Sequence, residues 1–70
     1  MLRMSPLKDT LRRERRMAGL TQGELAEKAD VGLTTISRIE SGDIEEPRVS
    51  TLRKLAHALG LEVRDLLAEE

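Results

Sequence analysis

The sequence predicts an all-α domain of five short helices, and three observations point to this fold class. Apolar residues recur at spacings of three, four and seven in several stretches, whereas no stretch alternates as a strand would. Glycines follow three of these stretches, at positions 19, 42 and 60, where helices commonly end. The chain has 70 residues and no Phe, Tyr or Trp, so its core must consist of aliphatic side chains. We expect residues 1–70 to form one domain, with 1–5 as a flexible arm.

The composition argues against several classes of protein. The chain has no cysteine and one histidine, so disulfides and thiolate metal sites are excluded, and we expect no metal or cofactor. It has no Gly-rich phosphate loop and no catalytic constellation, so we do not expect an enzyme. No segment has the length and apolar character of a membrane span or signal peptide, which leads us to expect a soluble cytoplasmic protein without membrane partners. The net charge of −1 gives no global support to nucleic-acid binding.

The first helix is predicted over residues 6–18. A serine that can cap the helix precedes Pro6, and proline is tolerated at the first helical position. Leu7, Leu11 and Ala18 lie at spacings of four and seven and predict one apolar stripe. The same helix also carries a basic side, made of Arg12, Arg13, Arg15 and Arg16.

The second helix is predicted to begin at Thr21. Thr21 and Glu24 fit a capping box, in which each side chain accepts a hydrogen bond from the other residue's backbone amide. Asp30 is expected to end the helix, because Asp tolerates the left-handed conformation better than most residues. Val31, in the turn that follows, is expected to point inward. The inward side of the helix is predicted to consist of Leu25, Ala26 and Ala29.

The third helix is predicted over residues 33–41 and has two contrasting faces. At 100° per residue, Ile36 and Ile39 share one side. The opposite side carries Leu33, Thr34, Ser37, Arg38 and Ser41. A solvated helix face usually carries Glu and Lys, whereas this one is small and rich in hydroxyls. It therefore suits a surface that must approach another molecule closely.

Two further helices are predicted after an acidic loop that holds Asp43, Glu45 and Glu46. The fourth helix covers about residues 49–59, and its spacing predicts a buried face. That face consists of Leu52, Leu55, Ala56 and Leu59. The fifth helix is short, over about residues 61–67. Its apolar residues could complete the core, form a dimer seam, or do both; they include Val63, Leu66 and Leu67.

Several short segments, spread over most of the chain, match one known sequence pattern at the spacing that the pattern requires. These segments are Gly19-Leu20-Thr21-Gln22, Glu24-Leu25-Ala26, Lys28-Ala29, Val31, Thr35-Ile36-Ser37-Arg38-Ile39-Glu40, Gly42, Pro47, Leu52, Lys54-Leu55-Ala56, Ala58-Leu59-Gly60 and Leu66-Leu67. In this register the sequence resembles the Cro/C1-type (XRE) family of phage-repressor-like helix-turn-helix domains. The resemblance implies a five-helix lambda-repressor-like bundle with the helix-turn-helix at helices 2 and 3. It also implies that the third helix lies in the major groove of double-stranded DNA.

The resemblance assigns roles to named positions. Leu33, Thr34 and Arg38 match base-contacting positions, with Ser37 as a helper. Arg can bind the acceptors of guanine bidentately and Thr can contact a thymine methyl group, whereas Leu can contact only methyls and sugars. The positions that match DNA-backbone contacts are Gln22, Thr35, Ser41 and Arg48, with Gln22 suited to a phosphate. The resemblance also implies an ion pair between Arg15 and Glu40.

The resemblance implies a sequence-specific transcriptional regulator, a repressor or autoregulator that binds a palindromic operator as a homodimer. Two recognition helices would then lie about 34 Å apart. The acidic loop and the net charge slightly favour an alternative. On that reading the same scaffold is a protein-interaction module, such as an adaptor or an antitoxin whose main partner is a toxin.

Overall fold

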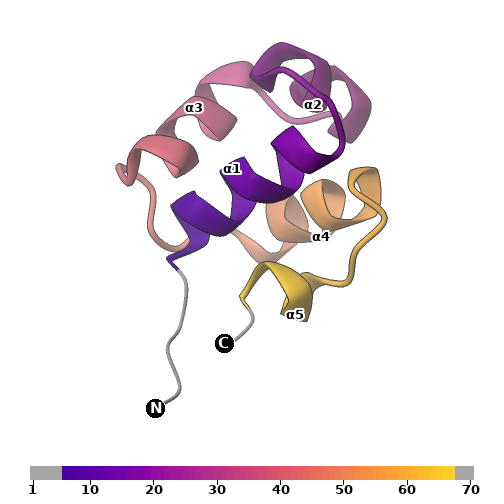
Figure 1. Cartoon of the computed structure of the whole chain (residues 1–70). Helices are drawn as coiled ribbons and strands as arrows, with labels where there is room; N and C mark the ends of the chain where they lie inside the picture. Colours follow the sequence, from indigo (N-terminus) through magenta and orange to yellow (C-terminus); the bar gives the residue numbers. More distant parts are fainter. Residues whose placement is uncertain (1–5, 68–70) are drawn as a thin grey trace.

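The computed structural model describes residues 6–67, and that part of the chain consists of five α-helices joined by short loops, without a strand. Figure 1 shows their arrangement. The helices are α1 (Leu7–Met17), α2 (Gln22–Ala29), α3 (Leu33–Ser41), α4 (Val49–Ala58) and α5 (Val63–Leu66). The all-α, five-helix prediction is therefore confirmed. The predicted arm at residues 1–5 lies outside the described residues.

The ends of α2 and α3 follow the signals in the sequence. Thr21 Oγ1 accepts a hydrogen bond from the Glu24 amide at 3.0 Å, and Glu24 Oε1 accepts one from the Thr21 amide at 2.8 Å. This capping box fixes the start of α2. Asp30 ends α2 in the left-handed conformation, with φ at 56°, and Gly42 ends α3 with φ at 92°. These predicted ends are confirmed.

The fifth helix is shorter than predicted, because Leu61 and Glu62 belong to the connection that precedes it. The Leu61 amide donates to the Ala56 carbonyl at 2.8 Å, which closes the end of α4. Glu62 has an extended backbone, and its amide donates to Asp65 Oδ2 at 2.8 Å. Helical conformation therefore begins only at Val63.

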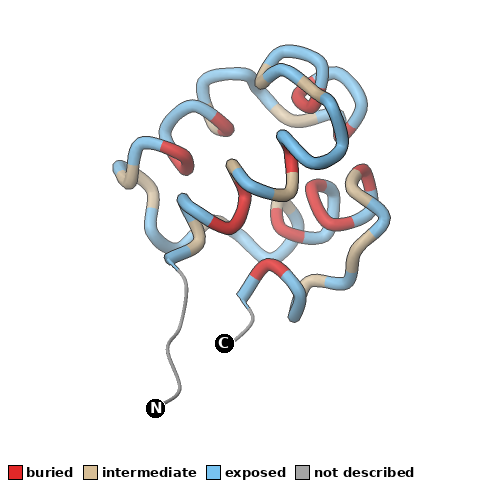
Figure 2. The backbone as a smooth tube through the Cα atoms, in the orientation of Figure 1, coloured by how far each residue is buried: buried red, intermediate tan, exposed pale blue. Residues whose placement is uncertain are grey.

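The core lies where the five helices face one another (Figure 2). Helix α1 packs against α3 and α5, α2 packs against α3 and α4, and α4 packs against α5. The buried hydrophobic side chains are small or aliphatic: Leu11, Leu25, Ala26, Ala29, Ile36, Ile39, Leu52, Leu55, Ala56, Ala58 and Leu66. At the C-terminal end, Leu66 is fully buried but Leu67 is 44% exposed. Of these two leucines, only Leu66 thus completes the core.

One predicted core position on α1 is wrong. Ala18 is exposed, because it lies beyond the last residue of α1 as the C-cap. The buried positions of α1 are instead Thr10, Leu11 and Arg15. Burial of Thr10 and Arg15 makes the inner side of α1 partly polar. Arg15 uses this position to contact α3.

Candidate nucleic-acid interface

Helix α3 has one buried face and one solvent-exposed face, as its sequence predicted. Ile36 and Ile39 are fully buried, and Glu40 is only 2% exposed. The opposite side is exposed and consists of Leu33, Thr34, Ser37, Arg38 and Ser41. We call this set of five residues the outer face of α3. Leu33 is 52% exposed, which is high for a leucine and leaves its side chain available to a partner.

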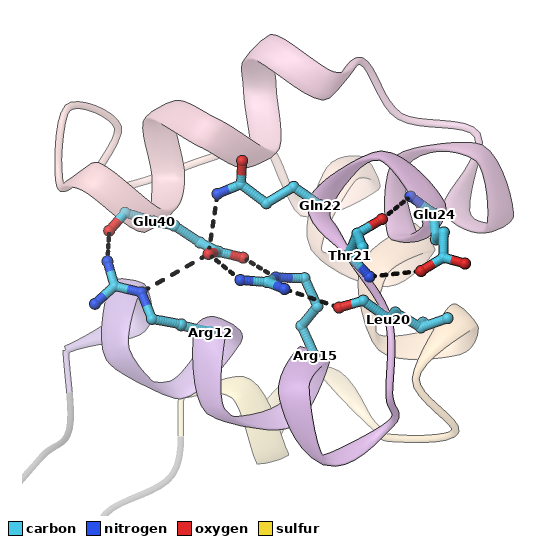
Figure 3. Close-up of polar contacts among 7 residues, drawn as sticks. All are labelled: Arg12, Arg15, Leu20, Thr21, Gln22, Glu24 and Glu40. Carbon is cyan, nitrogen blue, oxygen red and sulfur yellow. Dashed lines mark hydrogen bonds and ion pairs between the residues drawn. The ribbon is translucent and has the colours of Figure 1, made fainter.

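The carboxylate of Glu40 is the centre of a buried polar network (Figure 3). Arg15 Nε donates to Glu40 Oε2 at 2.7 Å, and Arg15 Nη2 donates to Glu40 Oε1 at 2.9 Å. The ion pair implied by the resemblance is thus present, with the bidentate geometry that makes such pairs specific. Arg15 Nη1 also donates to the Leu20 carbonyl at 2.8 Å. Arg15 therefore ties α1 both to α3 and to the segment that enters α2.

Two further side chains converge on Glu40. Gln22 Nε2 donates to Glu40 Oε1 at 3.1 Å. Arg12 Nη2 donates to the Glu40 backbone carbonyl at 2.7 Å, and Arg12 Nε lies 3.8 Å from Glu40 Oε1. Figure 3 shows the Gln22 side-chain oxygen pointing away from Glu40. The hydrogen bond to Glu40 therefore holds the side-chain amide of Gln22 in one orientation.

The position of Arg12 was missed by the sequence reasoning, although a signal existed. Arg12 precedes Arg15 by three residues, a spacing that places both on one side of a helix. Once Arg15 is assigned to Glu40, Arg12 is expected to lie near the same partner. From the sequence, Arg12 is predicted only as part of the basic side of the first helix.

Opposing effects act on the pKa of Glu40. Burial raises the pKa of the carboxyl, but hydrogen bonds from Arg15 and Gln22, with the charges of Arg15 and Arg12, outweigh burial and hold it below its usual value. The hydrogen bond and charge of Glu40 raise the pKa of Arg15 despite burial. Glu40 and Arg15 are therefore both charged at neutral pH. Two guanidinium groups face one carboxylate, so the network has a net positive charge.

The N-terminus of α2 lies beside this network. The first-turn amides of a helix lack acceptors within the helix. The capping box satisfies the amides of Thr21 and Glu24. The hydrogen bond that the Glu24 carboxylate accepts from the Thr21 amide also lowers the pKa of Glu24. Gln22 therefore stands at a helix start whose dipole favours an anion.

The remaining predicted backbone-contact residues lie around the two ends of α3. Thr35 is half-buried in the first turn of α3. Ser41 Oγ donates to the Arg38 carbonyl at 3.0 Å and accepts from the Asp43 amide at 3.4 Å, so it closes the far end of α3. Arg48 is exposed and is the N-cap residue of α4. The predicted phosphate contacts of these residues and of Gln22 stay predictions.

The part of the chain that the structure describes contains no group of three or more His, Asp or Glu side chains that could hold a metal ion. Within residues 6–67, no helix has the length and apolar character needed to cross a membrane.

Two helices joined by a tight turn, the second with one buried and one bare face, define a helix-turn-helix domain. A helix-turn-helix family model matches residues 11–66, and the chain belongs to the Cro/C1-type (XRE) helix-turn-helix family. Members of this class are DNA-binding regulatory domains rather than an enzyme class.

The chain is similar to proteins from two bacteria and a phage, which are named as a regulator, an antitoxin and a repressor. The chain is 38% identical over 65 residues to the uncharacterized HTH-type transcriptional regulator RghRB of Bacillus subtilis (strain 168), covering 93% of the chain and 47% of RghRB. It is 43% identical over 53 residues to the putative antitoxin HigA2 of Mycobacterium tuberculosis (strain ATCC 25618 / H37Rv), covering 76% and 52%. It is 42% identical over 60 residues to the immunity repressor protein of Bacillus phage phi105, covering 86% and 39%. The chain thus spans about half or less of each relative.

Two solved structures of one regulator share the fold. The first is the crystal structure of SinR, the master regulator for biofilm formation, in complex with DNA; it has a TM-score of 0.83 and 30% identity, covering 86% of this chain and 95% of that one. The second is the complex of SinR with SinI protein, with a TM-score of 0.84 and 31% identity, covering 87% and 59%. These likenesses confirm the predicted bundle.

Proposed function

We propose that this chain is a sequence-specific DNA-binding regulator, a repressor or autoregulator that binds a palindromic operator as a homodimer. The observation that carries the proposal is the outer face of α3, which is bare while the rest of that helix is fixed by buried contacts. A helix held in this way can enter the major groove with its side chains already positioned. The names of the RghRB, phage-repressor and SinR relatives support the same reading.

The proposed roles divide the site into base contacts and backbone contacts. Arg38 is suited to bidentate contact with guanine, and Thr34 to a thymine methyl group or a hydrogen bond, with Ser37 as a helper. Leu33 adds an apolar contact. Gln22 at the start of α2 would bind a phosphate through its remaining side-chain N–H and the backbone amides beside it. Further contacts with the DNA backbone are proposed for Thr35, Ser41 and Arg48.

Selection of duplexes from a random pool tests this proposal. The chain should enrich a palindromic site whose half-site centres lie about 10 base pairs apart, because two recognition helices read successive major grooves. The double variant Thr34→Ala/Arg38→Ala serves as the control and should lose the enrichment. If the chain enriches nothing, or if the variant enriches the same site equally well, the outer face of α3 is not the reading surface.

A second function has its own support. One relative is named as a putative antitoxin, and SinR also forms a complex with the SinI protein. The chain could therefore act as an antitoxin or adaptor whose main partner is a protein such as a toxin. Salt dependence distinguishes the two functions. Binding through several phosphates weakens steeply between about 50 and 200 mM salt. No DNA binding at low salt would favour the protein-binding function.

A further inference from the structure

Two cationic side chains of α1 reach the C-terminal end of α3. Arg12 Nη2 donates to the Glu40 carbonyl at 2.7 Å. Lys8 lies against Gly42, because a Cβ placed on Gly42 would be 3.4 Å from Lys8 Cδ and 3.8 Å from Lys8 Nζ. Glu40 and Gly42 are the two neighbours of Ser41, the last residue of the outer face. The two cations thus meet the outer face where it ends.

The charge of Arg12 is not needed to neutralise Glu40. Arg15 is buried and makes two hydrogen bonds to that carboxylate. The positive charge of Arg15 therefore balances the negative charge of Glu40. The side chain of Arg12 is 39% exposed, and its Nε lies 3.8 Å from Glu40 Oε1, beyond hydrogen-bonding distance. Lys8 is exposed and makes no ion pair within the described residues. Both side chains therefore present positive charge to solvent.

The position of these cations matters because the following loop is acidic. Lys8, Ser41 and Gly42 line a hollow of about 480 Å³ between α1 and the loop after α3. Glu45 and Glu46 line the same hollow and would repel a phosphate. A DNA backbone passing the end of α3 would therefore be attracted on the α1 side and repelled on the loop side.

A local role at the end of α3 accounts for part of this arrangement. Cations near a helix C-terminus stabilise the helix, because they interact favourably with the negative end of its dipole. That role involves no partner, so it predicts an effect on folding alone. Contact with DNA predicts, in addition, a change in the salt dependence of binding, since each phosphate contact releases counterions.

We propose that Lys8 and Arg12 form a phosphate-binding edge of α1 that contacts the DNA backbone beside the end of α3. This proposal rests on the DNA-binding function proposed above and extends it to residues outside the helix-turn-helix. Arg12 lies close to the Gln22 amide, since both approach Glu40 Oε1 (Figure 3). The edge supplies the positive charge that the acidic loop lacks.

The test measures the affinity of the chain for its selected duplex by fluorescence anisotropy between 50 and 200 mM salt. The slope of log affinity against log salt is negative, and its magnitude should fall by about 0.9 in Lys8→Gln and by the same amount in Arg12→Gln. The affinity lost across this range should then be about 3.5-fold smaller for each variant. Arg12→Lys should keep the slope because it keeps the charge. Arg64→Gln is the matched control, because it removes the same charge from α5, which packs mainly against α4 and α1.

Thermal unfolding of each variant separates the local role from the proposed one. A variant that lowers the melting temperature but keeps the wild-type slope overturns the proposal and leaves the DNA-binding function intact. A slope change in Arg64→Gln as large as in Arg12→Gln also overturns it. Failure of the wild type to bind any duplex overturns both proposals. If Arg12→Gln does not fold, Lys8→Gln and Arg12→Lys carry the test.

Discussion

The inner and outer faces of α3 differ in how fully their side chains are engaged. On the inner face, Ile36 and Ile39 are fully buried, and Glu40 accepts hydrogen bonds from two other helices. On the outer face, the side chains of Thr34 and Arg38 are exposed and make no hydrogen bond or ion pair within the described residues. The inner face thus fixes the position of the helix, while Thr34 and Arg38 on the outer face can change without disturbing it. Stability and recognition should therefore respond to different substitutions.

The largest effect is expected from Glu40→Ala, which breaks the inner face. This variant leaves Arg15 buried without its carboxylate, and removing one partner of a buried ion pair costs about 3–5 kcal/mol. Urea unfolding measures the loss. Glu27→Ala removes an exposed carboxylate from α2 and should change the free energy of unfolding by less than about 0.5 kcal/mol. Equal losses in the two variants would contradict the importance of the buried network.

A paired replacement sharpens the same point. Arg15→Met together with Glu40→Leu removes both charges, and buried ion pairs replaced by apolar residues of similar volume are often neutral or stabilising. We expect the double variant to be more stable than Glu40→Ala in urea unfolding. Gln22 should then lose the acceptor that orients its amide. A double variant as unstable as Glu40→Ala would mean that the network is needed for more than charge balance.

The outer face should show the reverse behaviour. Arg38→Ala should weaken binding to the selected duplex by about 1–3 kcal/mol, the discrimination expected of one bidentate base contact. Its free energy of unfolding should change by less than about 0.5 kcal/mol, because the side chain is exposed. Anisotropy titrations and urea unfolding of one preparation provide both values. Unchanged affinity with lowered stability would reverse the assignment of the two faces.

The inner face also predicts a pH dependence. The pKa of Glu40 is lower in the folded state than its ordinary value, so the unfolded chain binds more protons at acidic pH. The stability from Glu40 is therefore present above the unfolded pKa of about 4.3 and is lost as pH falls through the lower folded pKa. Arg15, whose pKa is raised, stays charged throughout this range. Urea unfolding from pH 6 to pH 3 should show this loss, and Arg15→Met/Glu40→Leu should show less of it.

The smallest effect is expected at Thr10 on the inner side of α1. Thr10 is 1% exposed, and among residues 6–67 its hydroxyl oxygen has no hydrogen-bond partner. Thr10→Val replaces this hydroxyl with a methyl group of similar shape and should raise the free energy of unfolding by about 1 kcal/mol. Thr10→Ser keeps the hydroxyl, loses a methyl group and should lower it by about the same amount. A lower stability of Thr10→Val would indicate that the hydroxyl has a partner in solution.

Local signals explain why so much of the fold could be predicted. The capping box at Thr21, the left-handed Asp30 and the apolar spacing of α3 each act within a few residues, so they can be read from the sequence. Ala18 was misplaced because alanine buries little surface and its position past the end of α1 depends on where the helix stops. The start of α5 was misplaced because Leu61 serves the end of α4.

The candidate site was predictable only in part, because it depends on contacts between distant segments. The exposure of the outer face follows from helical periodicity. The resemblance implied the Arg15–Glu40 pair, which the structure contains. The contacts of Arg12 and Gln22 with Glu40 join three helices. Helical spacing predicts that Arg12 lies on the same side of α1 as Arg15, but it does not predict which atom Arg12 contacts. Whether Gln22 also binds phosphate stays a prediction.

The most direct test of the two-face account is duplex selection from a random pool with Arg38→Gln. Gln pairs with adenine as Arg pairs with guanine. The selected half-site should therefore change from guanine to adenine at one position, while the rest of the site and the stability stay as in the wild type. Arg53→Gln makes the same change on the exposed side of α4 and should leave the selected site unaltered. An unchanged selected site in Arg38→Gln would contradict the account.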